Sequence, residues 1–206
     1  MMTAFSLAGL HMGNYAGPAL RWLYFVFGLA ATAVIGTGLV MWLGKRQLKH
    51  AKSERIPGEL RLVEVLNIAS MSGLLLAVAA FFWANRLLPV GLAGRADWEI
   101  NSFFVLWALS LVHALLRPGR RAWAEQLGLG ALAFTLLPLL NALSTGQGLD
   151  HSLAVGDWAM AGFDLTALAT GVFLAWAAAK MLRAPKPVAK RAPRTAKATA
   201  QAAQVH

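Results

Sequence analysis

Five long apolar stretches, separated by short polar or charged stretches, set the pattern of this chain. Each approaches or exceeds the roughly 18–20 apolar residues that an α-helix needs to cross a bilayer at about 1.5 Å per residue. The pattern predicts helices over residues 20–43, 63–88, 98–116, 122–143 and 158–182. The expected fold class is all-α, a polytopic membrane helix bundle with five transmembrane helices.

The basic residues lie mainly on alternate connections between these stretches. Of the 19 Lys and Arg residues, all lie in connections 44–62 and 117–121 or in the C-terminal segment from Lys180 onward, except Arg21, Arg86 and Arg95. Membrane proteins keep such base-rich connections in the cytoplasm. We therefore expect the N-terminus outside and the C-terminus in the cytoplasm, which agrees with an odd number of spans.

Composition supports a membrane protein built of three parts. The chain is 58% hydrophobic and 14% charged, whereas soluble domains are about a quarter charged. We expect an outer-side N-terminal segment over residues 1–19, the five-span bundle over 20–182, and a basic, disordered cytoplasmic tail over 183–206. The net charge of +10 then indicates attraction to anionic lipids rather than to nucleic acid. Because cysteine is absent, disulfides, iron–sulfur ligation and cysteine catalysis are excluded.

Small residues recur at every fourth position in three of the spans. Such ladders let helix backbones approach closely in lipid, and they also leave room for a flat cofactor. Plain helix packing is the simpler interpretation of each. The ladders are Gly28, Thr32 and Gly36, then Ala69, Gly73 and Ala77, and finally Ala167, Gly171, Ala175 and Ala179.

Ionisable residues inside or beside the lipid are the candidate functional residues, because they are costly there unless paired or ligating. His113, in the third span one turn before Arg117, is a candidate haem ligand, interhelical hydrogen-bond partner or proton relay. His11 lies just outside the first span and is an interfacial histidine or a metal ligand. Arg21, at the outer mouth of that span, can clamp a carboxylate such as a haem propionate. Its alternatives are a lipid-phosphate anchor or a partner for Asp164 in the fifth span.

Other polar residues are weaker candidates. Glu64, Asn67 and Met71 share one face of the second span, where a helix-start carboxylate and packing residues are the simpler reading. His151 is the other outer-side histidine and a second candidate partner for His11. The glycine pairs lie within spans rather than in strand-to-helix turns, so we expect no built-in NAD or flavin site.

Three segments resemble one known family. LHMGNYAGPALRWLYFVFGLAATAVIGTGLVMWLGKR (10–46) resembles the LHxGxxGG…GLxxxxxxxTGxxxW signature of PepSY-associated transmembrane proteins. WALSLVHALLRPGRRAW (107–123) and LPLLNAL (137–143) are similar to the C-terminal membrane part of the family's iron-uptake branch. This resemblance implies a multi-pass protein of the bacterial inner membrane that acts as a ferric-siderophore reductase with haem b. It would make His11 and His113 haem ligands near opposite membrane faces, along a path that carries electrons outwards to a periplasmic ferric chelate.

The chain also departs from the family pattern. Family members begin with another membrane helix and a periplasmic PepSY region, whereas ten residues precede His11 here, and Ala16-Gly17-Pro18 stands where the family has a glycine pair. We therefore expect the C-terminal part of such a protein, or one half of a split system. The missing haem ligands would then come from the absent portion or from an N-terminal PepSY-containing partner.

Three hypotheses for function follow. The first is an inner-membrane b-haem electron-transfer protein that belongs to a ferric-siderophore reductase. The alternative is a non-catalytic membrane scaffold or regulatory subunit that binds a periplasmic partner. The third is a proton-coupled transporter in which Asp164 and Arg21 form a coupling pair, although no inverted repeat or paired broken helices are evident.

Overall fold

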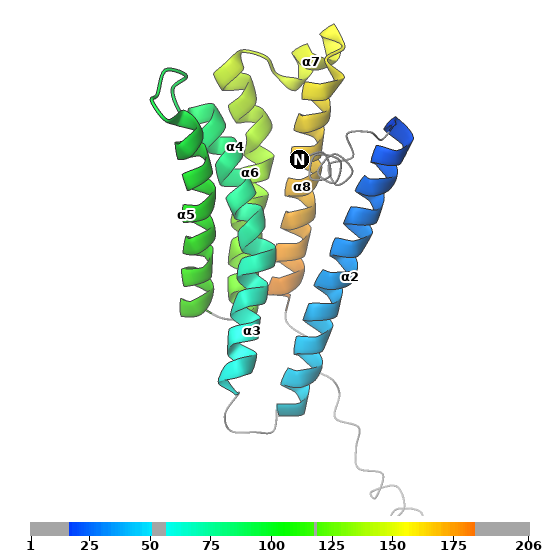
Figure 1. Ribbon diagram of the computed structural model, residues 1–206, viewed down its shortest axis with the longest axis vertical. Coiled ribbons are helices and arrows are strands. Elements are labelled where there is room, and N and C mark those ends of the chain that lie inside the picture. Colours follow the sequence, from blue (N-terminus) through cyan, green and yellow to red (C-terminus); the bar gives the residue numbers. More distant parts are fainter. Residues whose placement is uncertain (1–16, 51–56, 118, 184–206) are drawn as a thin grey trace, which may run out of the picture.

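The described part of the chain is entirely helical. A computed structural model describes residues 17–50, 57–117 and 119–183, and these residues contain no β-strand. In chain order the helices are α2 (Pro18–His50), α3 (Gly58–Ile68), the π-helix η1 (Ala69–Gly73), α4 (Leu74–Leu87), α5 (Arg95–Leu116), α6 (Arg120–Thr145), α7 (Leu149–Val155) and α8 (Trp158–Leu182) (Figure 1).

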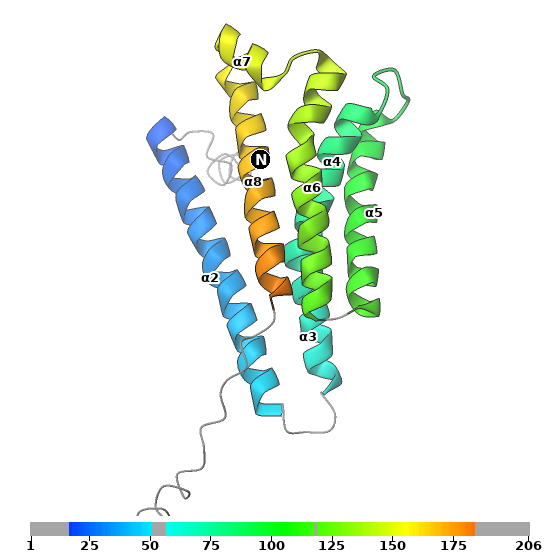
Figure 2. The same ribbon diagram turned by 180° about the vertical axis from the view of Figure 1, so that it is seen from behind.

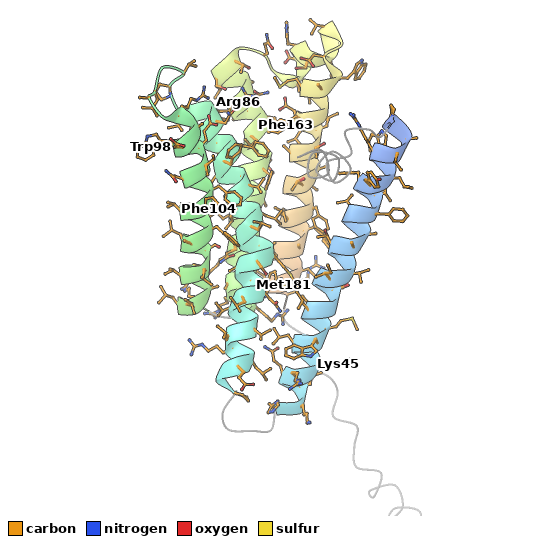
Figure 3. All side chains as sticks on the ribbon, viewed as in Figure 1. Lys45, Arg86, Trp98, Phe104, Phe163 and Met181 are labelled. Atoms are coloured by element: carbon orange, nitrogen blue, oxygen red, sulfur yellow. The ribbon has the colours of Figure 1, made fainter. Side chains whose placement is uncertain are left out.

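Five helical stretches in this part of the chain are long and apolar enough to cross a membrane. They are α2, the continuous run Gly58–Leu87 made of α3, η1 and α4, then α5, α6 and α8. Large apolar side chains such as Trp98 and Phe104 lie on the outside of α5, where they are more than half exposed (Figure 3). Because an apolar exterior of this extent suits lipid rather than water, the predicted fold class, a polytopic helix bundle, is confirmed.

Successive spans run in opposite directions, so most of the described basic residues lie at one end of the bundle (Figures 1 and 2). We call this the basic end; α2, α5 and α8 finish there, and α3 and α6 begin there. Its described bases are Lys45, Arg46, Lys49, Arg61, Arg117, Arg120, Arg121, Lys180 and Arg183. The two ends are therefore as unlike in charge as the sequence predicted. The assignment of the basic end to the cytoplasm stays a prediction.

Helices α6 and α8 form the most extensive contact of the bundle. At their crossing, a Cβ on Gly171 would overlap the Thr135 hydroxyl and would lie 3.1 Å from the carbonyl oxygen of Ala131. Leu137 and Leu174 fill the core beside this crossing. Helix α4 packs against α6 on one side and α5 on the other. The small-residue ladder of the fifth span therefore serves helix packing at Gly171.

The other two ladders have different surroundings. A Cβ on Gly73 would overlap the Ser110 hydroxyl, so this glycine lets η1 approach α5 closely. By contrast, a Cβ on Gly28 would meet no described atom within 4 Å. Helix α2 makes its main contact with α3, buries Leu43 as its one buried residue, and leans away from the remaining helices (Figures 1 and 2). Among the described residues, the ladder of the first span has no packing partner at Gly28.

The second span differs from the single α-helix predicted over residues 63–88. Its middle widens into the π-helix η1, where the Ser72 hydroxyl lies 2.8 Å from the Ile68 carbonyl. The indole nitrogen of Trp107 on α5 donates to the Ala69 carbonyl at 3.0 Å. Short π segments within α-helices occur frequently at functional sites. This one lies next to the polar residues described below.

A second feature lies in residues 144–157, which connect the fourth and fifth predicted spans. They contain the short helix α7, which lies between Gly146 with φ 70° and Gly156 with φ 75°. Both glycines adopt the left-handed conformation that residues with a Cβ avoid. Asp157 then caps α8, because its carboxylate accepts a 3.1 Å hydrogen bond from the backbone N–H of Met160.

Candidate functional site: two polar clusters inside the bundle

An ion-paired cluster joins α5 to α6 near the basic end. The Glu125 carboxylate contacts His113 through Oε2, 2.9 Å from the histidine Nε2, and Arg117 through Oε1, 2.6 Å from Nη1. The side chains of His113 and Glu125 are 34% and 39% exposed. Helix geometry places His113 and Arg117 four residues apart on one face, and both therefore reach the same carboxylate.

Gln126 ties this ion pair to the π-helix. Its side chain is 3% exposed, and its amide nitrogen donates to the Ser110 carbonyl at 2.8 Å. The same nitrogen lies 3.2 Å from His113 Nδ1, and the amide oxygen lies 2.8 Å from the Ser72 hydroxyl. A continuous set of polar contacts thus runs from η1 through Gln126 to the His113–Glu125 pair. Buried polar groups in lipid need such partners, and these contacts provide hydrogen-bond partners for polar groups of η1, α5 and α6.

This network assigns one tautomer to neutral His113. Its Nδ1 faces the amide nitrogen of Gln126, which can only donate, so Nδ1 accepts. The ring proton then sits on Nε2, from which it points to Glu125. The assignment follows from the hydrogen-bond partners rather than from an observed hydrogen. Both ring nitrogens are therefore engaged by protein groups.

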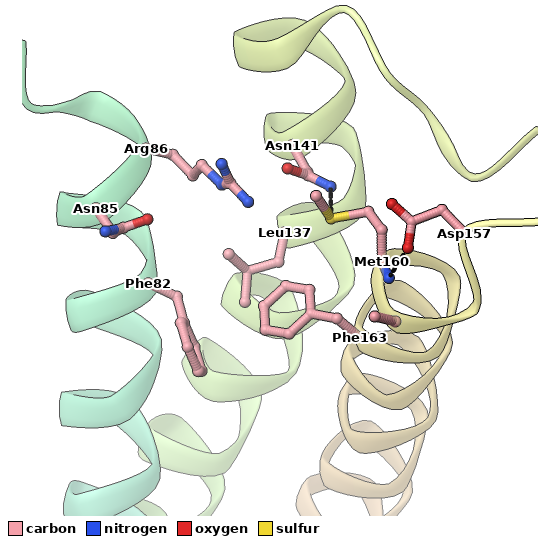
Figure 4. Close-up of a pocket in the computed structure, with 9 residues that line it drawn as sticks. Phe82, Asn85, Arg86, Leu137, Asn141, Asp157, Met160 and Phe163 are labelled. Carbon is pink, nitrogen blue, oxygen red and sulfur yellow. Dashed lines mark hydrogen bonds between the residues drawn. The ribbon is translucent and has the colours of Figure 1, made fainter. Parts of the chain in front are cut away.

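Two cavities accompany the polar residues. One, of about 230 Å³, lies beside His113 and is lined by α4, α5 and α6 residues. The other, of about 350 Å³, lies towards the opposite end of the bundle and is shown in Figure 4. Its lining comes from α4, α6 and the start of α8 and consists of Phe82, Asn85, Arg86, Leu137, Asn141, Asp157, Ala159, Met160 and Phe163.

The second cavity combines one cation, one carboxylate and amide groups above an aromatic floor. Arg86 on α4 points into it towards Asn141 on α6 (Figure 4). The rings of Phe82 and Phe163 meet edge to face, with centroids 5.1 Å apart, and close its inner side. An arginine that points into a membrane bundle rather than out to the headgroups is a candidate binding group for an anion.

Asp164 lies fully buried next to this cavity, between α6 and α8. Its Oδ1 accepts a hydrogen bond from the Asn141 amide at 3.3 Å. Asp164 Oδ2 and Asn141 Oδ1 have no partner among the described residues. Both atoms are acceptors, so each is a place where a hydrogen-bond donor would fit.

The structure separates the predicted site residues. His113 lies in the cluster at the basic end, whereas Arg21 lies on α2 towards the opposite end, in a shallow cavity with Pro18, Trp22 and Phe25. His11 lies outside the described residues. We predicted Arg21 as a partner for Asp164. In the structure the Asp164 carboxylate accepts a hydrogen bond from Asn141 in the α6–α8 interface.

Sequence reasoning missed Glu125, Gln126, Asn141 and Arg86 as site residues. A signal was available, because each is a polar residue within or at the edge of an apolar stretch, and such residues are rarely lipid-facing. The sequence does not show which helices touch, and hence which of these residues meet. The ion pair of His113 with Glu125 depends on the short turn at Gly119, whose φ is 96°, which returns α6 alongside α5.

The fold and the lipid-suited exterior define a multi-pass membrane protein with polar clusters inside its bundle. Residues 1–45 match the family described as PepSY-associated TM region. This match includes most of the motif at residues 10–46, on which the resemblance to PepSY-associated transmembrane proteins was predicted.

A longer relative is also similar to this chain. It is the Pseudomonas aeruginosa protein named Uncharacterized protein PA4219, with 33% identity over 148 residues. The match covers 67% of this chain and 36% of the relative, so the chain spans little more than a third of that protein's length. No solved structure matches the chain.

Proposed function

We propose that this chain is the membrane part of a bacterial inner-membrane protein that passes electrons to ferric siderophores during iron uptake. The observation that carries the proposal is the match of residues 1–45 to the PepSY-associated TM region, because this segment contains the His11 motif. In this proposal the basic end faces the cytoplasm and the cavity with Arg86 faces the periplasm. The remainder of the reductase belongs to a PepSY-containing portion or partner.

The charge distribution supports this direction of transfer. Ferric siderophores commonly carry anionic donor groups. The cavity towards the opposite end offers the Arg86 guanidinium and the Asn85 and Asn141 amides, beside one carboxylate, Asp157, that accepts from the Met160 backbone N–H. At the basic end, the described Lys and Arg residues suit a cytoplasmic face. The two ends therefore differ in charge and in polar groups, which suits different molecules at the two membrane faces.

Haem b is the electron carrier that the family resemblance implies, with His11 and His113 as ligands and Arg21 as propionate clamp. Around His113 the described residues do not fit this group as they are arranged. A histidine that ligates iron must present the lone pair of one ring nitrogen to the metal. In His113 both ring nitrogens face protein groups instead, because Nε2 lies 2.9 Å from Glu125 and Nδ1 lies 3.2 Å from Gln126. The adjoining cavity of about 230 Å³ is also below the roughly 300–1,000 Å³ of typical cofactor sites. In this arrangement His113 therefore has no free ring nitrogen for a haem iron.

The absorption spectrum of the membrane-extracted protein tests this assignment. The chain is produced with a PepSY-containing partner and a haem supply, and we expect a b-type spectrum that changes on reduction. His11→Ala should abolish or shift the bands, because His11 is the remaining family-motif ligand. His113→Ala should preserve them, because the His113 ring nitrogens contact Glu125 and Gln126.

His50→Ala is the matched control, since His50 lies in the last turn of α2, where its ring nitrogen Nδ1 lies 2.9 Å from the Arg46 carbonyl oxygen. Loss of the bands in His113→Ala alone would restore His113 as an axial ligand and contradict the network as its functional state. A preparation that binds no haem at all would overturn haem b as the electron carrier.

A further inference from the structure

The cavity beside His113 opens on the outside of the bundle between α5 and α6. Leu109 and Leu129 at its rim are 55% and 53% exposed, whereas Leu76 at its floor is 4% exposed. Both rim residues lie within apolar spans, on surfaces that face lipid. A ligand would therefore enter this cavity sideways from the bilayer rather than from water.

The lining is apolar except at one end. Leucines from α4, α5 and α6 form its walls, and the polar lining groups are Ser110, His113, Glu125 and Gln126. An engineered apolar cavity of about 150 Å³ is large enough to bind benzene. The present cavity of about 230 Å³ therefore has room for a substituted six-membered ring, but its size does not suit a haem.

We propose that this cavity binds the head group of a lipid-soluble hydroquinone. The ring would lie between the leucine walls, and one of its hydroxyl groups would reach the His113–Glu125 pair. A carboxylate offers about four lone-pair sites, and Glu125 uses one on each oxygen for His113 and Arg117. Each oxygen can therefore accept a further hydrogen bond from a phenolic hydroxyl.

Other lipid-phase ligands fit these groups less well. A plain acyl chain would fill the leucine walls but would leave the polar end without a partner, which is costly in an apolar environment. A fatty-acid carboxylate would place a second negative charge next to Glu125. Among the described residues, Arg117 is the one Lys or Arg that pairs with Glu125, so the two negative charges would share one cation. A hydroquinone supplies neutral donors on a flat ring.

Gln126 and the π-helix position the polar end of this cavity. Gln126 is held by the Ser110 carbonyl and the Ser72 hydroxyl, and it fixes the His113 ring through Nδ1. The histidine therefore keeps its Nε2 side towards Glu125 and the cavity. The proposal rests on the proposed function in one respect, since it names the hydroquinone as the membrane-soluble electron donor of that pathway. Oxidation of one hydroquinone to the quinone releases two protons and two electrons, and the two electrons reduce two Fe³⁺ ions of the chelate to Fe²⁺.

Binding of a short-tailed para-quinol, decylubiquinol, to the purified full chain in detergent or lipid nanodiscs tests the proposal. Calorimetric titration under reducing conditions should give saturable binding with one site per chain. Glu125→Gln should weaken this binding about tenfold or more, because a hydrogen bond to a charged group is lost. Leu129→Phe should weaken it by a similar factor, since the larger side chain would narrow the mouth of the cavity.

Matched controls separate these effects from general damage. Leu132→Phe alters an exposed leucine on the same helix that does not line the cavity, and Glu59→Gln removes an exposed carboxylate on α3. Both should bind like the wild type, and every variant is first checked for an unchanged elution profile and melting temperature. Equal binding by the wild type, Glu125→Gln and Leu129→Phe would overturn the proposal, as would tighter binding of palmitate than of the quinol.

The titration contains no ferric chelate, so the two proposals can fail separately. Absent quinol binding together with intact ferric reduction would overturn the hydroquinone site alone. Intact quinol binding without ferric reduction would overturn the proposed function and leave the site in place.

Discussion

Replacing Gly171 by leucine will prevent most of the protein from folding, or will lower its free energy of unfolding by about 3 kcal/mol or more. A Cβ at this position would overlap the Thr135 hydroxyl and lie 2.9 Å from the Thr135 backbone nitrogen. The backbone atoms cannot swing aside as a long side chain can. Helices α6 and α8 must therefore separate, and their contact is the largest in the bundle.

Gly162→Leu is the control for this prediction. Gly162 lies on the same helix, and a Cβ there would meet nothing within 4 Å. We expect the control to match the wild type in yield, elution volume and thermal unfolding in detergent, whereas Gly171→Leu should fail in all three. Equal stability of the two variants would contradict the α6–α8 packing described here.

Replacing Gln126 by leucine will lower the free energy of unfolding by about 2–4 kcal/mol. The substitution introduces an apolar side chain of similar size, and it removes the amide group that contacts Ser72, Ser110 and His113. In the bundle interior no bulk water replaces them. The loss should therefore exceed the fraction of a kilocalorie that a typical interhelical hydrogen bond contributes in membranes, about 0.6 kcal/mol.

Gln147→Leu provides the comparison, because Gln147 is exposed in the connection after α6. Unfolding in detergent, followed by tryptophan fluorescence, should show a clear loss for Gln126→Leu and almost none for Gln147→Leu. If Gln126→Leu proved as stable as the wild type, the network would contribute specificity rather than stability, contrary to the expectation stated here.

The spans were predictable because the bilayer imposes a simple length and polarity rule. The fifth span, predicted over 158–182, coincides with α8 (Trp158–Leu182). The first extends beyond its prediction of 20–43 to His50, because a helix can continue past the apolar run. In this last part of α2, the Arg46 guanidinium lies over the Trp42 ring, 4.9 Å from its centroid, and the polar residues up to His50 remain helical.

The polar clusters were less predictable, since they depend on which helices meet. His113 stood out in the sequence, but its partners Glu125 and Gln126 come from the next helix and are set by the turn at Gly119. The same holds for the small-residue ladders. Gly171 packs tightly and Gly28 meets nothing within 4 Å, although their spacing in the sequence is alike.

The proposed function requires electrons to cross the membrane through this protein to a ferric chelate on its outer side. The most direct test uses right-side-out membrane vesicles that contain the chain with its PepSY-containing partner, an internal reductant and an external ferric siderophore. Released Fe²⁺ is trapped outside by an impermeant colorimetric chelator. The account predicts a rate several-fold above that of vesicles that lack the chain, and equal rates in the two preparations would contradict it.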